Sequence, residues 1–210
     1  MIYSFYPVCD LEGDARVPKS NITKKVLAAA FKELVCKDSF EKVNVSSICD
    51  ACGVNRKTFY YHFQDKYELA EWIFNTEFIA VLKKTDISDQ WAFASAICQY
   101  FYRERTYYAG LFQYKGQNSF GQYFQAFMFE ALKPFLLPKS TAVTVVAGQA
   151  RMSEDEAASF YCHFFTDAVL ISVFRWITDG AAMPPDQFIS RLRSVADILL
   201  IRAKEVAADN

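Results

Sequence analysis

The sequence has few of the residues on which enzyme sites usually depend. Its 210 residues include two histidines and seven glycines. It contains no glycine-rich phosphate loop, no Gly-x-Ser-x-Gly motif and no His-Glu-x-x-His motif. Catalysis would need a site that follows none of these patterns. We therefore expect a protein that is not an enzyme and that uses no cofactor.

The cysteines are also few, and they indicate neither a disulfide framework nor a metal site. They lie mostly within apolar helical patterns, and no cationic and apolar leader segment is found ahead of them. Cys49 and Cys52 have the spacing of a metal or redox pair, but no second ligand pair follows at zinc-finger spacing. We interpret both as small buried side chains and expect a cytoplasmic protein that binds no metal. The six cysteines are residues 9, 36, 49, 52, 98 and 162.

Long uncharged runs are missing as well. The longest stretch without Asp, Glu, Lys or Arg covers residues 116–129 and is rich in Gln. A membrane-spanning helix needs about 20 apolar residues, so we expect no membrane role. The chain is nevertheless 52% hydrophobic and 22% charged, which is typical of a folded globular protein and not of a disordered one.

Charge is distributed unevenly along the chain, although the net charge is only −1. Residues 16–66 carry ten Lys or Arg against five Asp or Glu, and the rest of the chain carries thirteen against nineteen. Residues 16–66 are called the head here, and the rest of the chain is called the body. A basic head with an acidic body is expected when one part of a protein binds a polyanion such as DNA.

Helical periodicity and capping residues divide the basic region into short helices. Leu27, Ala30, Phe31 and Leu34 share one face of a first helix, which should begin near residue 20 and end near residue 37. Asn44 can cap a second helix over 45–52, which Gly53 stops. Asn55 can then cap a third over 56–63, and Asp65 with Glu68 can cap a fourth over 66–83.

The remaining sequence predicts a helical body. We expect helices near 89–104, 106–114, 119–136, 153–179 and 184–206, and a loop over 138–149. The predicted fold class is all-α, with an N-terminal three-helix helix-turn-helix domain and a C-terminal helical domain for ligand binding and dimerisation. The predicted domains are a flexible arm over 1–19, a DNA-binding domain over 20–66 and an effector-binding and dimerisation domain over 67–210.

The third predicted helix has two distinct faces. Phe59 and Phe63 are four residues apart and should point inward. The opposite face carries Arg56, Lys57, Tyr60 and Tyr61, a combination of cations and hydroxyl-bearing rings that suits a DNA major groove. A charged helix face taken alone is usually just solvated, so this pattern does not decide the function by itself.

The residues around this helix resemble a known family. The segment VNVSSICDACGVNRKTFYYHFQDKYEL is similar to the DNA-binding signature of the TetR family of bacterial regulators. Gly53-Val54 matches the turn, and Lys66 matches the residue that opens the fourth helix. One departure is that Asp38-Ser39 replaces the glycine usual before the aromatic residue, here Phe40. Asp tolerates left-handed conformations, so the departure changes little. Within the family, the segment GVNRKTFYYHFQDKYEL followed by Trp72 resembles the branch of dihydroxyacetone-kinase operon regulators, and Trp176 before Gly180 fits that branch too.

The resemblance implies a function, partners and site residues. It implies a cytoplasmic homodimeric transcription regulator that binds a double-stranded DNA operator, most relatives being repressors. Bases would be read by Arg56, Lys57 and Thr58. The DNA backbone would be met by Asn44 and Ser46 at the start of the second helix. Its phosphates would be held by Tyr60, Tyr61, His62 and Lys66, and we expect the Lys66 side chain to be exposed. The full predicted DNA-binding set is Asn44, Ser46, Asn55, Arg56, Lys57, Thr58, Tyr60, Tyr61, His62 and Lys66.

In the predicted body, two features suggest dimerisation and effector binding. Phe160, Phe164, Ala168 and Ile171 repeat every three or four residues, which predicts a dimer interface on the last two helices. Aromatic residues crowd the 100–127 region and can line an effector pocket, although core packing is the more common role of such residues. We expect His163 to be a packed core residue. The candidate ligand-binding residues are Tyr100, Phe101, Tyr108, Phe112, Tyr123 and Phe127.

Two alternatives remain open at this point. A helical protein-interaction module would explain the body but would leave the basic, tyrosine-rich helix without a role. A transcriptional activator that responds to a partner protein would keep the DNA-binding head, and its signal would be a protein instead of a small molecule. In either kind of regulator, an effector would act by favouring one spacing of the two heads over another.

Overall fold

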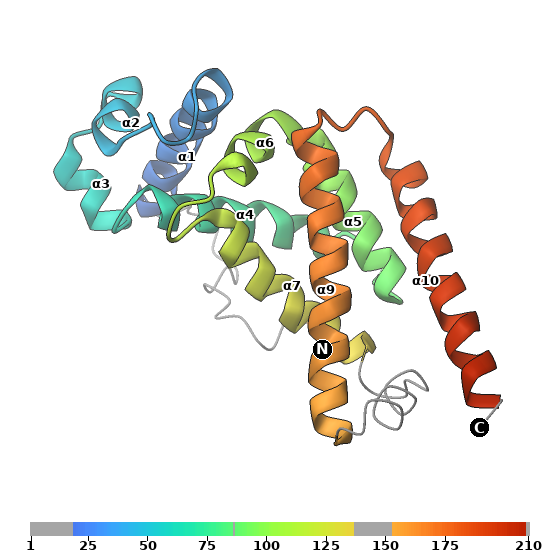
Figure 1. Cartoon of the computed structure of the whole chain (residues 1–210). Helices are drawn as coiled ribbons and strands as arrows, with labels where there is room; N and C mark the ends of the chain where they lie inside the picture. The colour runs from blue at the N-terminus through green and yellow to red at the C-terminus, as the bar shows by residue number, and fades with distance from the viewer. Residues whose placement is uncertain (1–18, 86, 137–152, 209–210) are drawn as a thin grey trace. The chain divides into compact units, whose positions relative to one another are not determined.

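The computed structural model describes residues 19–85, 87–136 and 153–208. All regular elements within these ranges are helices, which confirms the predicted all-α class. The predicted arm over 1–19, apart from Lys19, and the whole of the predicted loop over 138–149 fall outside the described residues. The chain divides into two compact units, of which the first ends at Ala70 and the second begins at Glu71. Figure 1 gives the helix labels.

The first unit contains three helices and the start of a fourth: α1 (Lys19–Lys37), α2 (Val45–Cys52), α3 (Arg56–His62) and α4 (Lys66–Leu82). These bounds agree with the predicted ones to within about two residues. Leu27 and Phe31 of the predicted α1 face are fully buried, as are Ile48 of α2 and Phe59 of α3. Burial of each such side chain contributes about 1.5–3 kcal/mol to the free energy of unfolding. The first unit therefore has a hydrophobic core of its own.

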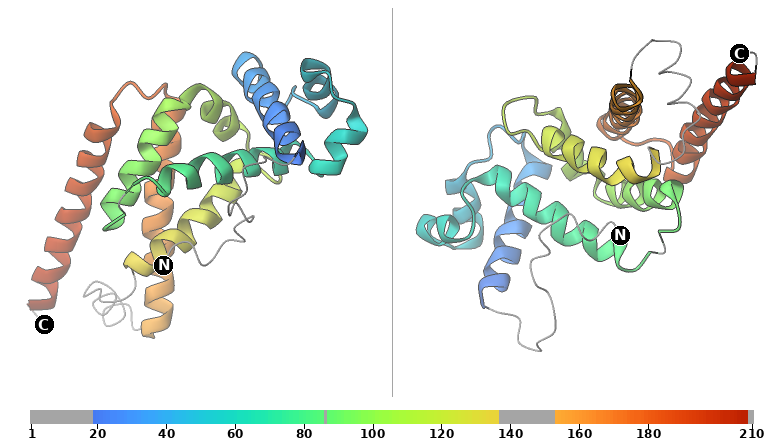
Figure 2. Two further views of the ribbon diagram at one scale, coloured as in Figure 1. Left: turned by 180° about the vertical axis from the view of Figure 1, so that it is seen from behind. Right: turned by 90° about the horizontal axis from the view of Figure 1, so that it is seen from below.

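The second unit continues along α4 and adds α5 (Gln90–Arg103), α6 (Arg105–Gln113), α7 (Phe120–Leu136), α9 (Glu154–Thr178) and α10 (Pro185–Ala208). In both Figure 1 and Figure 2, α9 lies beside α6 and α7, and α10 lies beside α5. Local capping explains two helix starts. Asp89 accepts hydrogen bonds from the backbone at the start of α5, and Ser153 with Glu156 forms the predicted capping box of α9.

The core of the second unit is dominated by aromatic rings. Phe74 and Phe78 of α4 are stacked with their ring centroids 5.1 Å apart. Phe74 also meets the rings of Phe124 at 5.5 Å and Phe127 at 5.1 Å, edge to face. Edge-to-face and offset pairs at these separations add about 0.5–1.5 kcal/mol each beyond the area they bury. The aromatic richness of the sequence is therefore largely explained by this core.

A second aromatic stack supports the connection between α9 and α10. Trp176 near the end of α9 lies between Phe188 and Tyr102, at 4.5 Å and 6.1 Å, with all three rings nearly parallel. Its indole N–H donates to the Met183 carbonyl at 2.8 Å. Trp176 thus fixes the turn that precedes α10.

In the part of the chain that the structure describes, one helix, over Asp155–Thr178, is long and apolar enough to cross a membrane by length and composition alone. Only 28% of its apolar window is buried. Its exposed apolar side chains include Phe160, Phe164 and Ile171. An apolar helix that a second copy of the chain covers would pass the same test, so this is weak evidence for a membrane.

Candidate DNA-binding site

The start of α2 is held by a reciprocal pair of hydrogen bonds. The Asn44 side-chain oxygen accepts from the Ser47 backbone N–H at 2.9 Å, and the Asn44 backbone N–H donates to the Ser47 hydroxyl at 3.1 Å. Asn44 is therefore a capping residue first, and any contact with DNA falls to its amide nitrogen. Ser46, also predicted to meet the DNA backbone, is exposed in the first turn of α2.

The turn between α2 and α3 depends on Gly53. Its φ of +67° lies in the left-handed region, and its backbone N–H donates to the Cys49 carbonyl to close α2. Asn55 then caps α3, because its side-chain oxygen accepts from the Thr58 backbone N–H at 2.8 Å and the Thr58 hydroxyl at 3.0 Å. The predicted helix-turn-helix is thus built from two capped helices joined by one left-handed glycine.

The two faces of α3 separate as the sequence predicts. Phe59 is buried, as is Phe63 immediately after the helix. Tyr61 is 82% exposed and Tyr60 51% exposed. Arg56 and Lys57 are exposed too. Large exposed aromatic side chains beside two cations form a surface that is typical of a binding site for a partner.

Arg56 and Tyr60 contact each other on this exposed face. An Arg56 Nη2 donates to the Tyr60 hydroxyl at 3.5 Å, and the guanidinium lies 6.0 Å from the centre of the tyrosine ring. This hydrogen bond raises the pKa of Arg56, which keeps the guanidinium charged. A contact this long restrains Arg56 loosely and leaves its donors available for a guanine edge or a phosphate.

His62 is half-buried and lies close to a lysine that the sequence analysis did not assign to the site. Burial, and then the charge of Lys24 in α1, lower the pKa of His62. The Lys24 ammonium lies 5.3 Å from the centre of the Phe63 ring. The sequence shows that residues 16–66 are basic overall. Only the packing of α1 against α3 shows that Lys24 is the lysine that lies near the end of α3.

Lys66 differs most from its prediction. We expected an exposed ammonium that reaches phosphate, but Lys66 is half-buried and its Nζ donates to three backbone carbonyls. The distances are 2.7 Å to Phe40, 3.3 Å to Glu41 and 2.7 Å to Val43. The ammonium has three N–H donors, and these carbonyls match that number. The expectation of exposure is therefore wrong, and burial lowers the pKa of Lys66.

The six candidate ligand-binding aromatics are packed together in the core of the second unit. Five are buried and Tyr123 is half-buried. The Tyr100 hydroxyl donates to Glu77 at 3.0 Å and lies 2.7 Å from the hydroxyl of Tyr108, and Tyr123 donates to Asn75 at 2.7 Å. Burial raises the pKa of both Tyr100 and Tyr108, so both stay neutral. None of the six lines the cavity described below, and their ligand-binding role stays a prediction.

The cysteines and His163 can also be placed. Cys49 is buried and Cys52 half-buried, and the Cys52 thiol donates to the Ile48 carbonyl at 3.1 Å. Burial raises the pKa of Cys49, which disfavours the thiolate. His163 is exposed and stacks on Phe129 with ring centroids 4.2 Å apart, so the prediction of a core histidine is wrong. Within the described ranges no group of three His, Cys, Asp or Glu can hold a metal.

Comparison with known proteins identifies both halves of this arrangement. A family model described as bacterial regulatory proteins of the tetR family matches residues 26–73, and a transcriptional regulator C-terminal region model of the same family matches residues 89–197. The second match covers more than half of the chain. The chain belongs to the TetR family. It is a DNA-binding transcriptional regulator of a non-enzymatic family, whose members bind DNA operators, act as dimers and are generally cytoplasmic.

One curated relative of the regulator is a transcriptional activator. A curated relative from Lactococcus lactis subsp. lactis (strain IL1403), the HTH-type dhaKLM operon transcriptional activator DhaS, is 35% identical over 79 residues. That match covers 38% of this chain and 41% of DhaS, so the chain aligns with about two fifths of this relative's length.

Two solved structures share the fold. The dihydroxyacetone kinase operon activator DhaS superposes with a TM-score of 0.58 at 22% identity, over 88% of this chain and 97% of that one. NalD, the secondary repressor of the MexAB-OprM multidrug efflux pump in Pseudomonas aeruginosa, superposes with a TM-score of 0.56 at 16% identity, over 88% and 96%. At these identities the likeness concerns the fold alone.

Proposed function

We propose that α3 of this regulator reads operator DNA in the major groove. The observation that carries the proposal is the exposed face of Arg56, Lys57, Tyr60 and Tyr61 on a helix whose other face is buried. Arg56, Lys57 and Thr58 are the base-reading candidates. Asn44, Ser46, Asn55, Tyr60, Tyr61 and His62 are the candidates for contact with the DNA backbone, and Lys24 is added to them because of its place beside His62.

The test is a fluorescence anisotropy titration of the full chain with duplexes from the region upstream of its own gene and of adjacent operons. The regulator should bind one upstream duplex far more tightly than a scrambled duplex. Its affinity should also fall steeply with salt, because binding releases counterions. Equal and salt-insensitive binding to both duplexes would refute the assignment of α3.

The dimer interface is proposed to lie on α9 and α10. Phe160, Phe164 and Ile171 are each more than half exposed on α9, and Val195 and Ile198 are likewise exposed on α10. An isologous pairing of these two helices across a two-fold axis would bury such side chains on both copies. The same pairing would place two copies of α3 for the two halves of a palindromic operator.

The sign of regulation is proposed to be repression released by an effector, as in most of the family. Activation is the second candidate, because the curated relative with 35% identity is an activator of the dhaKLM operon. That likeness also supports the assignment to the branch of dihydroxyacetone-kinase operon regulators. A reporter fused to the bound upstream region decides between the two, since deletion of the regulator raises expression from a repressed promoter and lowers it from an activated one.

A further inference from the structure

A cavity of about 430 Å³ lies in the second unit between the end of α4 and α5. Its volume falls within the range of about 300–1,000 Å³ that is typical of small-molecule sites. Small side chains leave the space open. Ala80 and Val81 line it from α4, and Ala92 and Ala96 line it from α5.

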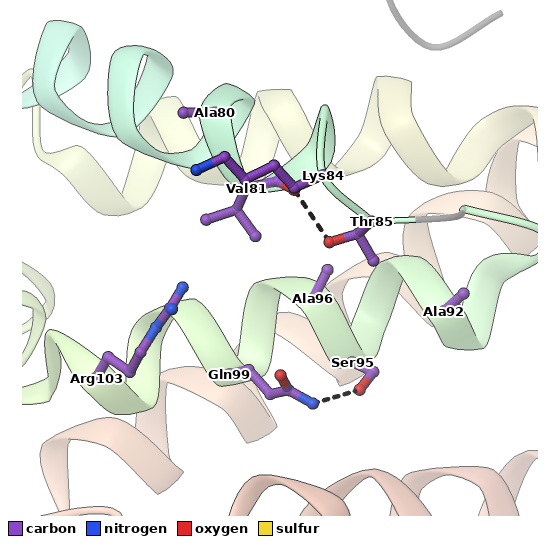
Figure 3. A pocket seen from close by; sticks show the side chains of 9 residues that line it. All are labelled: Ala80, Val81, Lys84, Thr85, Ala92, Ser95, Ala96, Gln99 and Arg103. Atoms are coloured by element: carbon purple, nitrogen blue, oxygen red, sulfur yellow. Dashed lines mark hydrogen bonds between the residues drawn. The ribbon is translucent and has the colours of Figure 1, made fainter.

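The polar lining of this cavity is cationic. Among the residues that the structure describes, Lys84 and Arg103 are the charged ones that line it, and none of these lining residues is a carboxylate. Both are exposed, and neither side chain makes a hydrogen bond or an ion pair with any residue in the described ranges. Figure 3 shows their side chains toward the same end of the cavity, Lys84 from the α4 side and Arg103 from α5. Thr85 and Ser95 carry hydroxyl groups nearer its other end, and Gln99 lies between.

We propose that this cavity binds a small phosphate monoester of a polyol and is the effector site of the regulator. The phosphate would accept hydrogen bonds from Arg103 and Lys84, whose like charges otherwise repel each other. The hydroxyl groups of the ligand would meet Ser95, Gln99 and Thr85. The body is acidic by sequence, so a cavity whose described charged residues are both cations favours anions there. This inference rests on the proposed regulatory function.

Isothermal titration of the full-length regulator with glycerol 3-phosphate tests the proposal. Inorganic phosphate, succinate and glycerol are the comparison probes. Saturable binding of glycerol 3-phosphate with no heat from glycerol is expected, and succinate should bind more weakly than the phosphate ester. Arg103→Gln and Lys84→Gln should each weaken the binding at least tenfold, while Lys83→Gln, a matched exposed lysine that does not line the cavity, should leave it unchanged.

Operator binding in the same samples separates the two hypotheses. If the parent binds its operator but no anionic probe binds, or if all three variants bind the probe like the parent, the cavity proposal is overturned while the regulatory function stands. If the parent fails to bind any upstream duplex, the proposed function fails. Tighter binding of succinate than of glycerol 3-phosphate would overturn the choice of phosphate.

The contacts of Lys66 carry a second and independent inference. Its ammonium binds the Phe40 and Val43 carbonyls, 26 and 23 residues earlier in the chain. Val43 directly precedes the cap of α2, and three residues separate Lys66 from the end of α3. One side chain therefore ties the segment that enters the helix-turn-helix to the segment that leaves it. The ammonium also lies 4.3 Å from the centre of the Phe40 ring.

We infer that Lys66 is a positioning residue that pre-organises α2 and α3 for DNA without touching phosphate. A phosphate contact would release counterions and add to the salt dependence of binding, whereas an internal hydrogen-bonding role would not. A phosphate contact would also tolerate arginine. Arginine cannot replace the compact ammonium among three converging carbonyls, because its donors lie in a wide planar fork.

The test compares Lys66→Met and Lys66→Arg with the parent on operator DNA at several salt concentrations. Measurements are made at a temperature at which circular dichroism shows every variant to be folded. Both variants should bind the operator at least tenfold more weakly, with a log–log salt slope equal to that of the parent. A slope reduced by about one per half-site in Lys66→Met, together with parental affinity in Lys66→Arg, would show a phosphate contact and overturn the inference.

Discussion

At the scale of single residues, Arg56 offers the sharpest test of base reading. It is the first residue of α3, it is exposed, and its guanidinium donates to the hydroxyl of Tyr60 at 3.5 Å. A weakly held guanidinium at the start of a recognition helix can turn to make two parallel hydrogen bonds to one guanine. The neighbouring tyrosine would then orient it without competing for it.

We predict that Arg56→Ala weakens operator binding by about 1–3 kcal/mol per half-site and flattens discrimination at one base position. Tyr60→Phe keeps the ring and should cause a much smaller loss with the same base preference. Anisotropy titrations on a set of single-base operator variants measure both. Lys83→Ala is the control for a lost surface charge. Unchanged base discrimination in Arg56→Ala would exclude direct readout by this residue.

His62 should make the stability of the first unit depend on pH. Its pKa is lowered in the folded state by burial and by Lys24, so the folded protein disfavours the charged imidazole. The unfolded chain therefore binds more protons below its own histidine pKa of about 6.5. Stability is then fully present above that value and is lost as the pH falls below it, until the folded-state pKa is passed.

We predict that the melting temperature falls between pH 7.5 and pH 5.5 and that His62→Gln removes part of this fall. Differential scanning calorimetry at matched ionic strength measures it. Bound operator should oppose the effect, since nearby phosphates favour the charged imidazole. A parent and a His62→Gln variant with identical pH profiles would contradict the assignment.

At the scale of elements, the helix-turn-helix depends on the left-handed turn at Gly53. A Cβ added there would meet nothing within 4 Å, so space is not the constraint and the backbone angle is. We predict that Gly53→Ala costs about 1–2 kcal/mol of stability, whereas Gly53→Asn costs less because Asn tolerates this conformation. Urea unfolding followed by circular dichroism gives both values. An equal cost for the two variants would mean that the strain lies elsewhere.

At the scale of the whole molecule, the apolar face of α9 should decide the oligomeric state. We predict that Phe160→Ser with Phe164→Ser converts a dimer into a monomer at tens of micromolar, because each serine removes a large apolar contact from both copies. Light scattering measures the mass. Ile22→Ser, which changes an exposed apolar residue of α1, is the control. A parent that is already monomeric would remove the basis for the interface.

Local features of the sequence determined the helices and their caps. The positions of α2, α3 and α9 follow from Asn44, Gly53, Asn55 and Ser153, because capping and helical periodicity involve residues at most a few positions apart. The inward and outward faces of α3 could also be predicted, because they depend on residues three or four positions apart. The family could be recognised from the sequence, since its DNA-binding signature is one contiguous segment.

The tertiary structure decided what depends on residues far apart in the chain. It placed Lys66 on carbonyls 23 to 26 residues away, Lys24 beside His62, and the predicted pocket aromatics against one another as core. It also left a basic cavity between α4 and α5, where the sequence shows only scattered alanines and two cations. A periodic sequence pattern predicts the helix face on which a side chain lies. The residues that this side chain contacts depend on how the helices pack, and a local pattern does not contain that information.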